Sequence, residues 1–85
     1  MTVDKPIPLN MFPLGTTAKI AEITCEFREA KHLADLGLTP GAELTVLRRV
    51  ATHGPLEISI RGSRLALGER IAKQIIVEPY VTIPQ

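Results

Sequence analysis

Cys25, Glu29 and His32 are the residues whose types and spacing could do chemistry in this chain. On a continuous helix, their i, i+4, i+7 spacing would place a thiolate, a carboxylate and an imidazole on one stripe. Such a donor set suits a borderline-soft divalent ion, Fe(II) or Zn(II). Ligands spread over two turns of one helix do not easily reach a single ion, so a solvated helix face is the competing interpretation. Neither interpretation requires a cofactor.

Residue combinations typical of a catalytic site are missing from the sequence. Cys25 and His32 have no third group to orient them, whereas an activated thiol needs a base in direct hydrogen-bond contact. A glycine-rich phosphate loop ending in Lys and Ser or Thr is also absent, which excludes a P-loop GTPase. We therefore expect a protein that is not an enzyme and has no catalytic residues.

The remaining histidine and the arginines allow more than one interpretation. His53 lies before Gly54-Pro55 and is interpreted as an exposed loop residue, with a metal ligand shared between subunits as the alternative. Basic side chains from adjacent strands and turns could form one patch for a protein partner, or could protect sheet edges from aggregation. They are Arg48, Arg49, Arg61, Arg64, Arg70 and Lys73. A net charge of +1 and the lack of aromatic residues for base stacking argue against a nucleic-acid partner.

A helix over Cys25–Leu36 would have to position the candidate ligands. Thr24 is its expected N-cap, and Glu26 and Glu29 lie near its positive end. At about 100° per residue, four apolar residues gather on the side expected to face a sheet. They are Phe27, Ala30, Leu33 and Ala34.

The segment Leu36–Gly41 predicts how this helix ends and the next strand begins. Gly37 is expected to take the positive φ that only glycine adopts without steric cost. Leu38 then folds back onto the last helical turn, against Leu33. Thr39–Ala42 fits a type II turn, with its proline setting φ and its glycine free to turn positive. Geometry this strongly specified fixes a helix against a small sheet.

Alternating apolar residues predict strands on both sides of the helix. The first is Thr16–Thr24, where the odd spacing of two isoleucines indicates a bulge or bend. After the corner, Glu43–Val50 is the next strand. A hairpin follows around the loop Gly62-Ser63, whose Gly-X pattern suits a II′ turn. In that register Arg61 opposes Arg64, and the isoleucines before the loop face the leucines after it.

Shorter elements complete the domain at its two ends. Leu9–Gly15 suggests a 3₁₀ turn whose Leu9, Phe12 and Leu14 cover the core. Gly68–Lys73 resembles one helical turn that brings Ile71 and Ala72 inward, and Lys73–Glu78 is the last strand. Residues 1–8 are interpreted as a flexible lead-in, 9–78 as the domain and 79–85 as a tail. About five short strands with one short helix inserted after the first predict a mainly β fold, a small partly open barrel.

Composition indicates the compartment. A single cysteine excludes an internal disulfide and suits a reducing environment. The sequence contains neither a signal-peptide pattern nor an apolar run near the ~20 residues that a membrane span needs. We therefore expect a cytoplasmic location.

Two blocks of the sequence resemble the signature of the FeoA domain, named for ferrous iron transport protein A. Leu33-Ala34-Asp35-Leu36-Gly37-Leu38-Thr39-Pro40-Gly41 is similar to the family's LxxLGLxPG motif. The segment from Gly54 to Leu67 is similar to its GPxxixvxGxxlaL block, and Leu9–Gly15 and Ile75-x-Val77 fit its opening and its closing strand. The resemblance covers about residues 9–78.

The resemblance implies an SH3-like barrel that acts as a non-enzymatic cytoplasmic accessory of ferrous iron transport. Its implied partner is the FeoB transporter, a membrane protein with a cytosolic GTP-binding domain, so this chain would reach the membrane only through that partner. The same barrel recurs at the C-terminus of metal-dependent repressors, which associates the family with transition-metal binding. The alternative function is therefore a metal-sensing regulatory domain.

We expect the partner to contact the corner after the helix and the helix itself. The residues concerned are Leu36, Leu38, Thr39, Pro40, Arg28 and Lys31. A conformationally fixed apolar corner binds with little ordering cost, although Leu38 has the competing role of packing under the helix. Recognition of polyproline segments is excluded, because that mode needs an aromatic-lined groove and the chain has no Trp.

Overall fold

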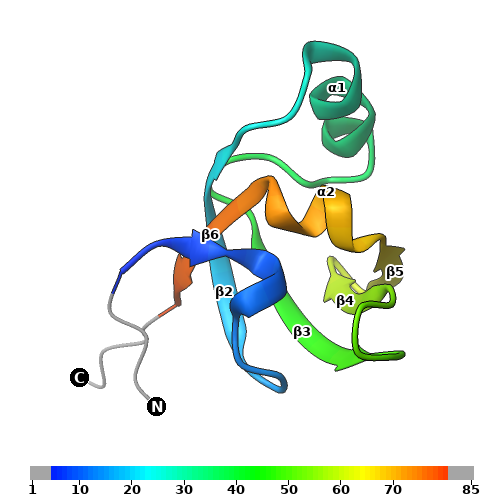
Figure 1. Ribbon diagram of the computed structural model, residues 1–85. Coiled ribbons are helices and arrows are strands. Elements are labelled where there is room, and N and C mark those ends of the chain that lie inside the picture. The colour runs from blue at the N-terminus through cyan, green and yellow to red at the C-terminus, as the bar shows by residue number, and fades with distance from the viewer. Residues whose placement is uncertain (1–4, 81–85) are drawn as a thin grey trace, which may run out of the picture.

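The computed structural model describes residues 5–80, which form one antiparallel sheet with two short helices and a 3₁₀ turn (Figure 1). The elements are β1 Ile7–Pro8, η1 Leu9–Met11, β2 Thr17–Ile23, α1 Phe27–Asp35, β3 Glu43–Arg49, β4 Leu56–Ile60, β5 Ser63–Leu67, α2 Glu69–Lys73 and β6 Ile75–Pro79. The strand order is β1-β6-β2-β3-β4-β5, and β1 and β5 remain at the edges. The mainly β, partly open barrel is therefore confirmed, with six strands in place of about five.

A single apolar core fills the inside of the curved sheet. Burial follows the alternation of the strands, as in β4, where Leu56, Ile58 and Ile60 are buried while Glu57 and Ser59 are half-buried on the other face. Leu9 and Phe12 cover one end of this core, as predicted. The described residues include no buried polar or charged side chain. Burial of apolar area is thus the main stabilising term.

The corner after α1 has the predicted geometry. Gly37 has φ +94° and donates to the carbonyl of Ala34 at 2.9 Å, while Leu38 donates to that of Leu33 at 2.9 Å. These two bonds define a Schellman motif, and the accompanying apolar contact joins Leu38 and Leu33, both buried. Gly41 has φ +93°, and the amide of Ala42 donates to the Thr39 carbonyl at 3.0 Å, which confirms the type II turn.

Backbone bonds connect this corner to β2. The amide of Gly41 donates to the Ile20 carbonyl at 2.7 Å, and the amide of Ile20 donates to the Ala42 carbonyl at 2.8 Å. The predicted irregularity of β2 is confirmed at the same place, because its register with β6 shifts between Ile20 and Glu22. The bulge therefore bends β2 where the corner is attached.

The helix begins later than predicted. The predicted range was Cys25–Leu36 with Thr24 as N-cap, whereas α1 starts at Phe27 with Glu26 as N-cap. Thr24 does not cap the helix, because its amide (2.7 Å) and its hydroxyl (3.0 Å) both donate to the carbonyl of Gln74. These bonds extend the pairing of β2 with β6 by one residue.

Two residues assigned to the core are exposed. Phe27 is 83% exposed, because it lies at the start of a nine-residue helix that stands away from the sheet. Of the predicted inner side of α1, only Leu33 is buried, while Ala30 is half-buried and Ala34 is exposed. Leu14 is 54% exposed, since the chain turns at residues 14–15 and directs this side chain outward.

The hairpin forms with a register two residues away from the predicted one. Ile60 pairs with Ser63, so the loop is Arg61-Gly62 and not Gly62-Ser63. Arg61 has φ +50° and Gly62 φ +79°, the combination of a type I′ turn. Because a two-residue slip preserves the face of every side chain, the predicted burial remains correct although the pairing was wrong.

The ends of the domain also differ from expectation. Ile7–Pro8, predicted within the flexible lead-in, form β1 and pair with β6. The last strand starts at Ile75, since α2 occupies Glu69–Lys73 with Gly68 as its N-cap. Residues 1–4 of the predicted lead-in and 81–85 of the predicted tail lie outside the described residues. Neither helix in residues 5–80 has the length and hydropathy to cross a membrane.

Replacing Gly37 with Ala should lower the free energy of unfolding by about 1–2 kcal/mol, because an L-residue would have to adopt a left-handed conformation. The added Cβ meets only ordinary contacts, its nearest atom being Arg61 Cδ at 3.6 Å, so the cost is confined to the backbone. Gly68→Ala is the matched control, since Gly68 has no atom within 4 Å of the added Cβ and φ −61°. Its effect should stay within about 0.5 kcal/mol. Urea unfolding followed by circular dichroism measures both, and equal losses would contradict the left-handed requirement.

Candidate partner-binding groove

The residues predicted to bind a metal do not come together. Cys25 precedes α1 and is half-buried, so it does not continue the stripe formed by Glu29 and His32. The carboxylate of Glu29 is bound by Arg70, at 3.0 Å and 3.4 Å. Across residues 5–80, no three His, Cys, Asp or Glu side chains are grouped so that they could hold a metal ion. The spacing argument failed because the helix does not reach back to Cys25.

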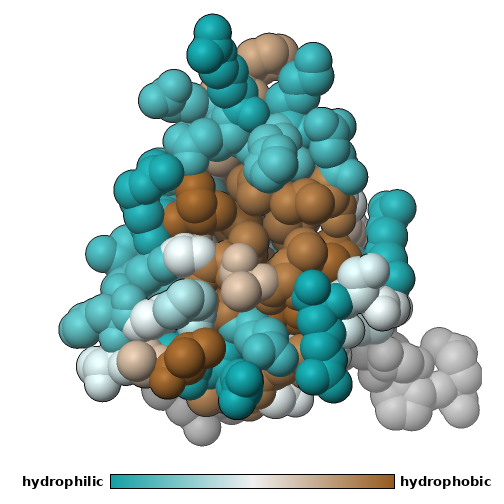
Figure 2. All heavy atoms as spheres, turned by 90° about the vertical axis from the view of Figure 1, so that its right-hand side faces the viewer, coloured by the Kyte–Doolittle hydropathy of each residue, from teal (hydrophilic) through white to brown (hydrophobic). Residues whose placement is uncertain are grey.

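A hollow of the described surface lies between α1 and the segment that runs from the end of β5 into α2. It has a volume of about 370 Å³ and is open to solvent. Its lining residues are Arg28, Glu29, His32, Leu33, Leu36, Ala66, Leu67, Gly68 and Ile71. Figure 2 shows apolar side chains gathered in the middle of this face, beneath the hydrophilic top formed by α1. The groove therefore has an apolar floor and a polar rim on the α1 side.

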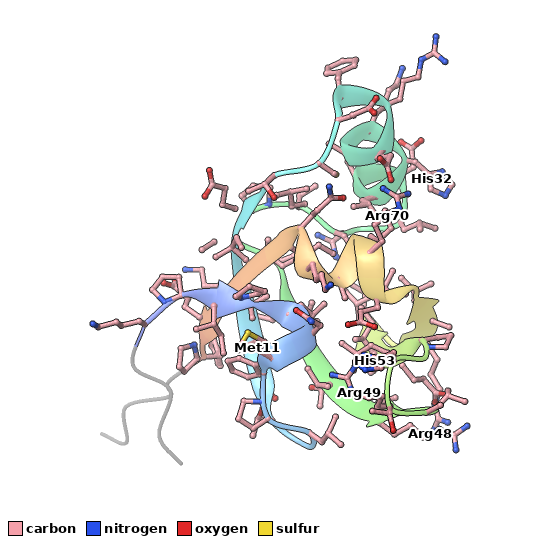
Figure 3. The ribbon with its side chains drawn as sticks, in the orientation of Figure 1. Met11, His32, Arg48, Arg49, His53 and Arg70 are labelled. Atoms are coloured by element: carbon pink, nitrogen blue, oxygen red, sulfur yellow. The ribbon has the colours of Figure 1, made fainter. Side chains whose placement is uncertain are left out.

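An ion pair joins the two helices at Glu29, one of the residues that line the groove. The guanidinium of Arg70 on α2 reaches the carboxylate of Glu29 on α1, with an N–O distance of 3.0 Å. Figure 3 shows this side chain extending toward α1 beside His32. The hydrogen bond with Glu29, followed by its Coulombic attraction, raises the pKa of Arg70 above its ordinary value. Both side chains remain partly exposed, so the pair positions α1 more than it stabilises the fold.

At the other end of α1, Arg61 of the β4–β5 hairpin packs against Gly37. Its Cδ lies 3.6 Å, and its Nε 3.7 Å, from the point where a Cβ would begin. A Cβ at this position would make only ordinary contacts with the arginine stem, so glycine is needed here for its positive φ. Arg70 thus bonds to the first turn of α1, and Arg61 lies near Gly37, just after the end of the helix.

The predicted partner residues fall into two groups. Arg28 and Leu36 line the groove, and Lys31 lies exposed on the same helix. Pro40 is exposed and Thr39 half-buried at the corner. Leu38 is 0% exposed, so its assignment to a contact surface was wrong: the Schellman motif requires it under the helix.

Sequence reasoning missed the side of the groove that does not belong to α1. This side is formed by the end of β5, the residue after it and α2, more than 30 residues beyond α1 in the sequence. Its lining residues are Ala66, Leu67, Gly68 and Ile71, and nothing in their local pattern marks them as part of a groove. Leu36 was the available signal, because it is an apolar residue at a helix end and is 40% exposed.

The basic side chains do not form one patch. Arg48 and Arg64 share one carboxylate, that of Glu57, at 3.2 and 3.7 Å. Lys73 contacts Glu69 at 3.8 Å, and Arg49 donates to the carbonyl of Asn10. In Figure 3, Arg48 lies at the lower edge of the molecule, whereas Arg70 lies between α2 and α1. His53 is an exposed loop residue, as predicted, with Nδ1 3.3 Å from Glu69.

Comparison with known proteins assigns the family. The model of the FeoA domain matches residues 7–79. The chain belongs to the FeoA family. It is 32% identical over 73 residues to a candidate Fe(2+) transport protein A from Methanocaldococcus jannaschii, a match that covers 80% of this chain and 87% of the relative.

Solved structures place this FeoA-family protein among SH3-like barrels. A crystal structure of an iron uptake regulatory protein, FeoA, is 30% identical and superposes with a TM-score of 0.79, covering 89% of this chain and 99% of that chain. A manganese-dependent transcriptional repressor superposes with a TM-score of 0.80 at 22% identity, covering 94% of this chain and 45% of that one. At this identity the likeness to the repressor shows a common fold alone. The predicted SH3-like architecture is confirmed.

Substituting Arg70 with Met should loosen α1, because it removes the ion pair with Glu29 and keeps most of the side-chain length. We expect faster amide hydrogen exchange in α1, measured by mass spectrometry, with unchanged exchange in β2 and β6. Arg48→Met is the matched control, since Arg48 is similarly exposed (68% against 71%) but pairs with a carboxylate on the sheet. Unchanged exchange in α1 of the Arg70 variant would show that the ion pair does not position the helix.

Proposed function

We propose that this protein is a non-enzymatic cytoplasmic accessory of ferrous iron transport, and that it binds the cytosolic part of a FeoB-type transporter through the groove beside α1. Membership of the FeoA family supports the role in ferrous iron transport. The relatives named for Fe(2+) transport and iron uptake support the same process. Iron enters this proposal as the cargo of the transporter.

The groove is the observation that carries the proposal. Its floor exposes parts of Leu36 and Ile71, which lie side by side with further apolar lining residues in one concave site. An apolar patch rimmed by charged side chains is typical of a protein-interaction site. Both walls are fixed before a partner arrives, by the Schellman corner on one side and the β4–β5 hairpin on the other. Binding then has a small ordering cost.

The metal-sensing alternative has no comparable support. The likeness to the repressor is one of fold, and fold does not transfer function. Among residues 5–80 no donor cluster is available to sense a metal. A protein partner is therefore the function that the geometry favours.

Leu36→Asp should weaken binding to the purified GTP-binding domain of the transporter by about tenfold or more, because it places a charge on the apolar floor. Leu36 is 40% exposed, so the variant should fold. Leu14→Asp is the matched control, since Leu14 is 54% exposed and does not line the groove. Biolayer interferometry compares the three proteins.

Equal binding by folded Leu36→Asp and wild-type protein would move the contact away from the groove. Absence of wild-type binding, both to this domain and to the intact transporter in detergent, would contradict the proposed partner.

A further inference from the structure

The open edge of the sheet lies next to the groove. β5 pairs with β4 on one side, and its other side has no strand neighbour in the described sheet. In a two-residue hairpin the pair beside the loop, Ile60 and Ser63, exchanges hydrogen bonds, and bonded and non-bonded pairs then alternate. The backbone groups of Arg64 and Ala66 consequently point away from β4. No other backbone group in residues 5–80 bonds to them.

Helix α1 lies opposite this free edge with the groove between them. Ala66, Leu67 and Gly68 line the groove from the β5 side, and Leu33 and Leu36 line it from the helix. Figure 1 shows α1 above α2 and away from the sheet, with β5 at the far end of α2, and Figure 2 shows the apolar floor below α1. Ala66, whose backbone groups point away from β4, thus lines the hollow on one side, and apolar side chains of α1 line it on the other.

Among the charged side chains that line the groove, Arg28 has no ion-pair partner in the described residues. Arg28 on its rim and Arg61 at the end of α1 have no carboxylate within ion-pair distance among the described residues. The carboxylate on the rim, Glu29, is already bound to Arg70. Glu26 lies close enough to Arg70 to contribute to its raised pKa, but it does not line the groove.

Arg61 adds an independent observation, because it occupies a backbone conformation that is unfavourable for arginine. A non-glycine residue with φ +50° at a hairpin loop costs about 1–2 kcal/mol relative to glycine. Asn, Asp or Gly is the usual residue at this turn position. Strain of this kind is retained where the side chain has a use, and the Arg61 side chain extends to Gly37, the residue after the groove-lining Leu36.

We propose that the β5 edge binds an extended acidic segment of the partner by strand addition. Its backbone would pair with Arg64 and Ala66, its alternate apolar side chains would enter the groove, and its carboxylates would reach Arg28 and Arg61. The identity of the protein that supplies the segment rests on the proposed function. The mode of binding does not, since it follows from the edge, the groove and the charges.

A peptide probe tests the mode directly. An eight-residue capped peptide alternating aspartate and valine should slow the amide exchange of Arg64 and Ala66 in ¹⁵N-labelled protein. The same peptide with lysine in place of aspartate should not, because charge complementarity is lost. A version N-methylated at alternate residues should also fail, because it cannot form the ladder hydrogen bonds.

Two variants test the mode with the transporter's GTP-binding domain. Ala66→Pro removes the outward amide and is tolerated at an edge strand, whereas Ala66→Val keeps that amide. We expect the proline variant to bind about tenfold more weakly than the valine variant. Arg61→Asn keeps a type I′ turn and removes the charge, so binding should weaken and become less sensitive to salt.

The outcomes separate the mode from the partner. Equal binding of the transporter domain by the Ala66→Pro and Ala66→Val variants overturns strand addition and leaves the proposed function intact. Protection by the acidic peptide without binding of the transporter overturns the proposed function and leaves the mode. Protection of the same amides at high protein concentration without peptide, together with dimers in sedimentation, would assign the edge to a second copy. If the proline variant does not fold, equal protection by the N-methylated peptide overturns the proposal on the wild-type protein.

Discussion

The attachment of the corner to β2 is the constraint on which the rest of the structure depends. Leu38 packs against Leu33 beneath the helix, and the turn that follows exchanges two backbone bonds with Ile20. The first contact sets where α1 ends, and the second sets where β3 begins against β2. Since β3 pairs with β4, and β4 pairs with β5, this attachment also determines where the free edge of the sheet lies relative to the helix. The groove is a result of that chain of placements.

The sequence predicted local geometry correctly where a conformation requires a particular residue type. Gly37 and Gly41 mark positive φ, and a leucine after the first of them marks the fold-back, so the helix end and the type II turn were predicted correctly, whereas the bonds to Ile20 were not foreseen. Strand faces were correct because burial follows a period of two. The hairpin register was wrong because a slip of two residues leaves that period unchanged, and because Arg61 takes a conformation that residue preferences assign to Gly or Asn.

The remaining errors arose from contacts between residues that are far apart in the sequence. Phe27 was assigned to the core from helical periodicity, which says which residues share a face but not how far that face lies from a sheet. The metal stripe failed for a related reason: Thr24 bonds to Gln74, fifty residues on, and this delays the helix beyond Cys25. The second wall of the groove comes from β5, Gly68 and α2, which approach α1 in space and are joined to it by the ion pair of Arg70 with Glu29. No local pattern encodes such an approach.

The bonds at Thr24 and at Gly41 have a consequence for how this architecture can vary. They fix both ends of the segment between β2 and β3 that contains α1. Thr24 bonds to Gln74, just before β6, and Gly41 bonds to Ile20 in β2. The sheet is therefore complete without the helix, and the helical arm is a closed loop on its surface. Doubling the length of such a loop costs only about 0.6 kcal/mol in closure entropy. The arm can consequently lengthen, shorten or change its composition across related barrels while the sheet stays the same, so one scaffold can present differently shaped grooves to different partners.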